Sequence, residues 1–340
     1  MLLEGKKNRH VKPQRLGAMS LTKDRLFYLL LYHTLTPEQI ELIEKEGITF
    51  IPRIGQITLQ DLETLSQLRP DWREQSYKRA EERRQKEETE IIPLPSWPED
   101  SRGLPNAILR SALFGVVRRG RRRVLDREVI AAVGGVVIRF TGERLDQADL
   151  DVWEHCIHLT REQGLGAYLT FSAHSFLKAI GRPTDGRSHR WLRASLKRLH
   201  NSEVEISVRR PSSPEEGYQG RLLKRWEIAD KGRHLIRLDP KLAVLYEGHQ
   251  WTKLVWQQRH RLKGHPLAQW LHGFFSTHRE PLPYKVETLR KLCGSEMKEL
   301  RYFRKELREA MALLTKATGW QVWIDERDCL QVIRSDPSSL

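Results

Sequence analysis

Residues of buried type recur at helical spacing in three long stretches of the chain. The first runs from Asp149 to Gln163, and the other two begin near Arg187 and Lys298. Positions three and four residues apart lie on one side of an α-helix. The predicted inward faces are Leu150, Trp153, Ile157 and Thr160; Leu192, Ser195, Leu196 and Leu199; and Leu300, Phe303, Leu307, Ala310, Met311 and Leu314. The spacing therefore predicts three amphipathic helices.

Other stretches have the pattern of β-strands. Val136 to Phe140 is rich in β-branched residues, and Glu203 to Val208 alternates polar and apolar side chains. Pro211 to Gly220 is rich in Ser, Pro and Gly, which favours a turn. We predict that Leu222 to Ile228 runs back beside Glu203 to Val208 and forms a hairpin with it.

One short pattern occurs twice in the chain. Residues 176–181 and 289–294 each open on an apolar residue, carry Lys at the third position and end on Gly181 or Gly294. Gly after a helix end accepts the left-handed conformation, so each copy predicts a tight turn. A basic amphipathic helix follows both turns, and we expect a pair of strands after each helix. This order indicates two winged helix-turn-helix units.

The predicted fold class is α+β, with two tandem winged helix-turn-helix domains at residues 104–238 and 239–334. A mostly helical or flexible region at residues 1–95 precedes them. It contains an apolar helix near Leu26 to Tyr32, a capped helix beginning at Thr36, and a charged helix or linker from Trp72 to Glu90. Pro93, Pro95 and Pro98 form a stiff connector that predicts a domain boundary.

The charge of the chain favours an anionic partner. Lys and Arg total 59 against 44 Asp and Glu, a formal net charge of +15. A phosphate backbone is the commonest such partner, and a membrane surface is the competing one. No apolar run reaches the ~18 residues of a spanning helix, and no signal or lipidation pattern opens the sequence. We therefore expect a cytoplasmic protein that does not associate with membranes.

The two basic helices are the predicted DNA-reading elements. A major groove admits one α-helix, where Arg and Lys can pair with guanine or hold phosphates. On the first helix we assign Arg187, Arg190, Trp191, Lys197 and Arg198; on the second, Lys298, Arg301, Tyr302, Lys305 and Arg308. Acidic residues flank only the second helix, so we expect the first to read bases and the second mainly to grip the backbone. A solvated helix face is the alternative for either one alone.

A dense basic run lies near the start of the first predicted domain. It comprises Arg118, Arg119, Arg121, Arg122 and Arg123. Arginines this close together repel one another without an anion, which favours an arm that lies across phosphates or in a minor groove. A solvated loop between two strands is the alternative.

Local motifs for catalysis and for cofactors are lacking. There is no G-x-x-x-x-G-K-[ST] loop, and His155 and His158 lack the further ligands of a metal site. Cys156, Cys293 and Cys329 lie far apart and are expected to be small buried apolar residues rather than ligands or disulfides. We predict a non-enzymatic protein without cofactor or metal. The alternatives are a transcriptional repressor with tandem winged helices and a strand-transfer or nicking enzyme with helix-turn-helix domains.

Several short sequence motifs indicate a family. They are Ser96–Asp100, Leu104–Asn106, Arg110–Phe114, Phe140–Gly142, Leu145, Leu169–Phe171, Gly186–Arg187, Gly248–His249, Trp251–Lys253, Phe274–Pro281 and Leu289–Gly294. Through them the chain resembles, from about Trp97 to Ile333, the TrfA-type replication initiators of broad-host-range plasmids. Residues before Trp97 do not share the resemblance. Glu90 to Pro95 stand where the family prototype has its hydrophobic sliding-clamp motif.

The resemblance implies a function. Such initiators bind direct repeats (iterons) at a plasmid origin, help to open the duplex, and recruit the host replication initiator and the replicative helicase. They typically act as monomers, and their inactive dimers limit plasmid copy number. The resemblance also places Arg187, Arg190, Lys298 and Arg301 in the family's recognition-helix regions. Initiators of this kind often repress their own promoter too.

Overall fold

The computed structural model describes residues 35–334 except 36, 52–54, 69, 118, 119, 121, 209–215, 230 and 231. The chain divides between Thr89 and Glu90 into two compact units. We call residues 1–89 the N-terminal unit and residues 90–340 the C-terminal body. The helix predicted near Leu26 to Tyr32 lies outside the described residues.

The N-terminal unit has a small core of its own. Its elements are α2 (Pro37–Glu46), β1 (Ile48–Ile51), β2 (Gly55–Thr58), α3 (Leu59–Leu68) and α4 (Trp72–Thr89). The core comprises Leu35, Ile40, Ile43, Ile57, Leu62, Leu65 and Trp72. The helices at Pro37 and Trp72 agree with the predicted pattern, but the antiparallel pair β1–β2 was not expected.

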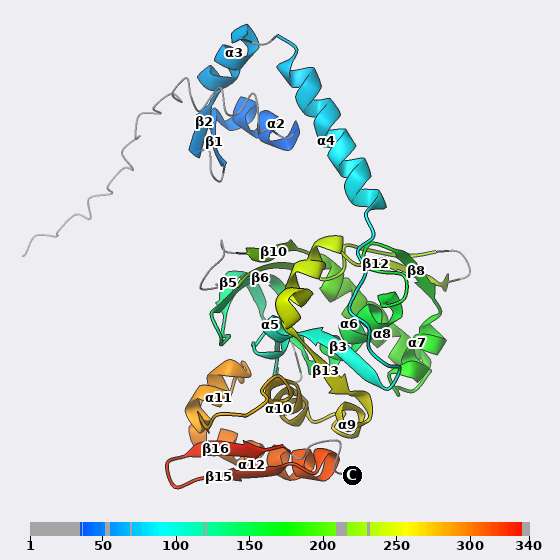
Figure 1. The fold of residues 1–340 in the computed structure, drawn as a ribbon, viewed down its shortest axis with the longest axis vertical. Helices are drawn as coiled ribbons and strands as arrows, with labels where there is room; N and C mark the ends of the chain where they lie inside the picture. The colour runs from blue at the N-terminus through cyan, green and yellow to red at the C-terminus, as the bar shows by residue number, and fades with distance from the viewer. Residues whose placement is uncertain are drawn as a thin grey trace, which may run out of the picture. The chain divides into compact units, whose positions relative to one another are not determined.

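The C-terminal body begins with strands that pair with later segments of the chain. Its first part comprises β3 (Ser101–Pro105), α5 (Asn106–Leu109), β4 (Phe114–Gly115), β5 (Val124–Ile130), β6 (Val136–Glu143) and β7 (Leu145–Asp146). The predicted strand at Val136 to Phe140 is confirmed as part of β6, where Ile138 and Phe140 are buried. β6 is an inner strand of a four-stranded sheet ordered β10-β9-β6-β5 (Figure 1).

The predicted hairpin is wrong. β9 (Glu203–Val208) pairs with β10 (Glu216–Gly220) and with β6, so residues 216–220 are a strand and not part of a turn. The segment after Leu222 forms β11 (Arg225–Ile228), which pairs with β12 (His234–Arg237) in another sheet. Local alternation marks a strand but does not choose its partners, and one of the two partners of β9, β6, lies more than sixty residues earlier in the chain.

We call the first copy of the common pattern, with its sheet, the first repeat. It comprises α6 (Gln147–Thr160), β8 (Tyr168–Phe171), α7 (Ala173–Ala179), α8 (Gly186–Asn201), β11 and β12. The hairpin β9–β10 is inserted between α8 and β11. The helix predicted from Asp149 is confirmed as α6, and its Trp153 is fully buried.

The second repeat follows after η2 (Pro240–His249), β13 (Trp251–Val255) and α9 (Trp256–Arg261). It comprises α10 (Pro266–Ser276), β14 (Tyr284–Lys285), α11 (Val286–Leu292), α12 (Leu300–Thr318), β15 (Gln321–Ile324) and β16 (Cys329–Ile333). β13 pairs with β3, and Leu254 belongs to the core of the first repeat. The predicted division at residue 238 thus falls ahead of a segment that packs on the first repeat.

Both repeats have the same sheet order. In the first the order is β11-β12-β8 and in the second β14-β16-β15, so the last strand lies in the middle each time. Each repeat follows the order helix, strand, two helices and two strands, apart from the β9–β10 hairpin inserted in the first. Each repeat has its own core, one centred on α6 and α8 and the other on α10 and α12. The α+β class is confirmed.

Candidate DNA-binding surface

The turns of the two repeats have the same geometry. Gly181 and Gly294 both have φ of +64°, the left-handed conformation that the sequence predicted. The Arg182 N–H donates to the Leu177 carbonyl at 2.8 Å, and the Ser295 N–H donates to the Arg290 carbonyl at 3.1 Å. Paired with the glycine N–H bonds to Lys178 and Lys291, these are two Schellman caps. The sequence pattern thus marks one backbone motif used twice.

Helix α8 begins at Gly186, five residues after Gly181, and is capped by Asp185. The Asp185 Oδ1 accepts the Ser188 N–H at 2.7 Å, and this hydrogen bond lowers the pKa of the carboxyl. The predicted inward face, Leu192, Ser195, Leu196 and Leu199, is buried. Capping and burial on one side leave the basic side of the helix facing outward.

Three of the five residues assigned to α8 are exposed, namely Arg187, Arg190 and Lys197. Arg193, which the sequence reasoning missed, is exposed as well. Its spacing of three from Arg190 and four from Lys197 places it on the same side and could have identified it. These four cations form the outward face of α8.

Arg198 and Trp191 have structural partners. Arg198 donates to both oxygens of the fully buried Asp149, at 2.6 and 3.2 Å. Trp191 is half-buried, with the guanidinium of Arg182 3.5 Å from its ring centroid. Arg198 therefore neutralises a carboxylate in the core, so we do not place it among the outward cations of α8.

The arginines between Arg118 and Arg123 also differ in their surroundings. Arg118, Arg119 and Arg121 lie outside the described residues. Arg122 is largely buried and pairs with Asp146 at 2.5 Å and with Asp149 at 2.9 Å. Arg123 is exposed and contacts Glu128. At Arg122 the run is thus anchored on the start of α6, which a free arm would not be.

All five residues assigned to the second reading helix are exposed. Lys298 precedes α12, and Arg301, Tyr302, Lys305 and Arg308 follow along it. The Arg301 guanidinium lies 4.7 Å from the Tyr302 ring centroid, so the two side chains form one flat surface. The buried side of α12 includes Phe303, Leu307 and Leu314, as predicted.

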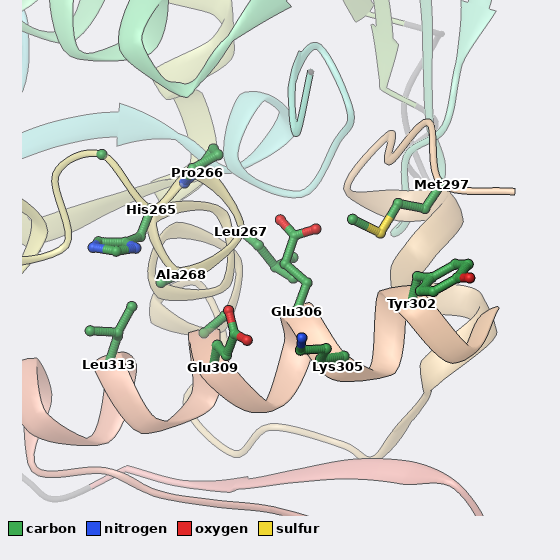
Figure 2. A pocket seen from close by; sticks show the side chains of 12 residues that line it. His265, Pro266, Leu267, Ala268, Met297, Tyr302, Lys305, Glu306, Glu309 and Leu313 are labelled. Carbon is green, nitrogen blue, oxygen red and sulfur yellow. The ribbon is translucent and has the colours of Figure 1, made fainter. Parts of the chain in front are cut away.

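The two helices differ in what surrounds these cations. α8 contains five Lys and Arg and no acid, a net +5, whereas α12 contains five and two acids, a net +3. A groove of about 450 Å³ runs between α12 and the start of α10. Figure 2 shows Lys305 beside Glu306 and Glu309 in this groove, with Leu267, Met297 and Leu313 lining it. Only α8 has a uniformly basic outward face.

The turns between the last two strands differ too. In the second repeat the β15–β16 turn contains Asp325, Glu326 and Asp328 with one cation, Arg327, and Arg304 pairs with Asp328 at 2.7 Å. In the first repeat the exposed Arg233 lies beside the turn between β11 and β12, whereas Arg225 lies at the far end of β11 and pairs with Glu227. The exposed Glu326 would therefore repel a phosphate backbone, and Arg233 would attract one.

The histidines singled out in the sequence are packed into the protein. His158 lies between the Trp97 indole, at 3.2 Å, and the Glu99 carboxylate, at 3.1 Å. His155 contacts the Phe176 ring, and burial lowers its pKa to about 3. Within the described ranges, no three His, Cys, Asp or Glu side chains come together as a metal site would need. Cys156 and Cys293 are buried as predicted, whereas Cys329 is only half-buried.

Comparison with known proteins identifies a family that matches most of the chain. The family model of the TrfA protein matches residues 71–330. The plasmid replication initiator protein TrfA of Escherichia coli is 30% identical over 228 residues, which cover 65% of this chain and 58% of that protein. This chain thus spans less than two thirds of that relative's length.

Solved structures of RctB are also similar. One structure of its domains 2 and 3 gives a TM-score of 0.49 at 14% identity, covering 67% of this chain and 97% of that one. A second gives 0.43 at 14% identity, covering 67% and 95%. Separately, no described helix is both long and apolar enough to cross a bilayer.

Proposed function

Because this chain belongs to the TrfA family, we propose that it is a plasmid replication initiator that binds direct repeats at a replication origin. It acts in the cytoplasm on double-stranded DNA. The observation that carries the proposal is the duplicated turn, each copy of which presents an exposed basic helix in a chain of net charge +15. Two such helices can enter two successive major-groove segments of one duplex.

The two helices make different contacts with the DNA. The outward face of α8 (Arg187, Arg190, Arg193 and Lys197) reads bases, because it is basic throughout and a side chain there can reach a guanine edge. α12 holds the backbone through Lys298, Arg301, Lys305 and Arg308, since its acidic neighbours and the acidic β15–β16 turn disfavour deep insertion. Arg118, Arg119, Arg121 and Arg123 add contacts to phosphate.

Binding leads to initiation without catalysis by the protein itself. The bound initiator helps to open the duplex beside the repeats and recruits the host replication initiator and the replicative helicase. It also represses its own promoter, and dimers of the chain are inactive. The N-terminal unit, which has its own small core, is available for contacts with host proteins.

A mobility-shift titration tests the proposal. The probe is the origin fragment with its direct repeats, and the control is the same fragment with the repeats scrambled. Specific sites are bound about 10³-fold or more tightly than non-specific DNA, so the repeats should shift at far lower protein concentration. Equal affinity for both fragments would contradict sequence-specific origin binding. Nicked or covalently bound supercoiled plasmid would contradict the non-enzymatic assignment.

A further inference from the structure

The turn of the first repeat contacts the segment that leads into the second repeat, α9 and the connection from α9 to α10. A Cβ added to Gly181 would lie 1.9 Å from Cε1 of His260, which follows β13 on α9. The Lys263 ammonium, from the α9–α10 connection, donates to the carbonyls of Gly181 and, at 3.4 Å, Ile180. Gly181 is therefore needed twice, for its positive φ and for the close approach of His260.

The turn of the second repeat is held by residues that precede the first repeat in the C-terminal body. A Cβ on Gly294 would lie 2.6 Å from Nη2 of Arg144, the residue just before β7. Arg144 donates to the Gly294 carbonyl at 2.9 Å and pairs with Glu296 at 3.0 Å. The backbone of Val116 donates to the neighbouring Cys293 carbonyl at 2.8 Å. Each copy of the duplicated turn thus contacts residues that lie outside its own repeat.

A buried ion-pair cluster joins α9, which leads into the second repeat, to α6 of the first repeat. Arg259 of α9 is fully buried and donates to Asp151 of α6 at 2.9 Å. It also pairs with Glu154 at 3.2 Å and donates to the Gln147 side chain at 3.2 Å. Breaking such a network would leave charge buried without a partner, so the arrangement resists sliding of one half over the other.

The first turn of α8 faces the second repeat across a cleft. The cleft has a volume of about 580 Å³, and its lining includes Arg187 and Trp191 of α8 with Lys263 of the α9–α10 connection and Pro266 at the start of α10. Each reading helix starts a few residues after its turn, at Gly186 and Leu300. A fixed turn therefore fixes the start of the helix that follows it.

We propose that Arg144, His260 and Lys263 are positioning residues that lock the separation of α8 and α12, so that the protein selects DNA by the spacing of its two half-sites. This inference rests on the proposed function. One base pair moves a half-site by about 3.4 Å along the duplex and rotates it by roughly a tenth of a turn. A locked pair of helices cannot follow such a change without losing contacts at one half-site.

Spacing variants of one duplex test the lock. The full chain first selects a preferred duplex from a random 30-base-pair pool, and that duplex is remade with one base pair inserted or deleted between its half-sites. The wild-type chain should bind the altered duplexes about ten-fold or more less tightly, the size expected for one lost base contact. Arg144→Ala and Lys263→Ala, tested separately, should reduce this ratio to below about three-fold. Arg127→Ala is the control, because Arg127 is exposed and pairs with Glu205 within the four-stranded sheet.

The outcomes separate the inference from the function. A wild-type chain that enriches a duplex but tolerates the altered spacing overturns the lock alone. Two folded variants that keep the wild-type ratio overturn the assignment of the lock to Arg144 and Lys263. A pool without any enriched duplex overturns the proposed function itself. A smaller ratio in either variant, at an unchanged thermal midpoint and with the control unaffected, supports the lock, because general destabilisation would weaken all duplexes equally.

Discussion

The first and second repeats share a backbone motif but not a surface. Gly181 and Gly294 have the same φ, and the two three-stranded sheets have the same order. α8, however, has a net charge of +5 without an acid, whereas α12 has +3 and borders a groove with Glu306 and Glu309. One turn geometry can therefore support two kinds of DNA contact, and the side chains beyond the turn decide between them.

The repeats also differ in how arginine is used. In the first repeat Arg122 and Arg198 converge on one buried carboxylate, that of Asp149, to which Ser195 also donates at 2.6 Å. In the second repeat Arg304 pairs with Asp328, and both side chains are at least one-third exposed. The first repeat uses arginine to hold its core, and the second uses it near solvent. Three predictions examine these differences.

The largest effect is expected on stability. Arg198→Ala leaves Asp149 buried with one cation fewer, and losing one partner of a buried pair lowers the unfolding free energy by about 3 kcal/mol. Arg304→Ala, the matched change in the second repeat, should lower it much less, because solvent screens the exposed pair. Urea denaturation measures both. Equal losses would show that burial does not distinguish the two arginines.

The next effect is a loss of stability in acid. Burial lowers the pKa of His272, in the core of the second repeat, to about 3 from its usual 6.5. The unfolded chain takes up the proton first, so this residue favours unfolding as the pH falls below 6.5, by about 1.4 kcal/mol per pH unit until about pH 3. Between pH 7 and pH 5, His272→Gln should therefore lose about 2 kcal/mol less unfolding free energy than the wild-type chain.

The same measurement compares the repeats. His155 in the first repeat has its pKa lowered to about 3 by burial as well, so His155→Gln should weaken the acid dependence similarly. If the repeats unfold together, both variants change the acid dependence of the same single unfolding transition. Two transitions, each changed by only one variant, would contradict the close coupling of the two halves through Arg259. An unchanged acid dependence in both variants would show that neither histidine is held neutral.

The smallest effect is expected at the turns between the last strands. Glu326 is exposed in the acidic β15–β16 turn, and Glu326→Lys should strengthen binding to any duplex by about 0.5–1 kcal/mol at low salt. Arg233→Glu, beside the corresponding turn of the first repeat, should weaken it by a similar amount. Fluorescence anisotropy at two salt concentrations measures both. If neither changes affinity, these turns do not lie near phosphate.

Features that depend on neighbouring residues could be predicted from the sequence. Gly181 and Gly294 end helices because glycine alone accepts the required φ easily, and the inward faces of α6, α8 and α12 follow from spacing. Features that depend on distant partners could not. Arg198 looks like a surface residue until Asp149, 49 positions earlier, is brought beside it. Besides the adjacent β10, β9 pairs with the distant β6, which no local alternation indicates.

The unequal roles of α8 and α12 are the central claim, and a specificity ratio tests it most directly. Affinities for the selected duplex and for random duplex would be measured for Arg187→Ala/Arg190→Ala and for Arg301→Ala/Lys305→Ala. The account predicts that the first pair weakens selected DNA by about 1–3 kcal/mol per lost base contact and random DNA by much less, which reduces the ratio. The second pair should weaken both duplexes about equally and leave the ratio unchanged. A ratio that falls only in the α12 variant, or equally in both variants, would contradict the claim.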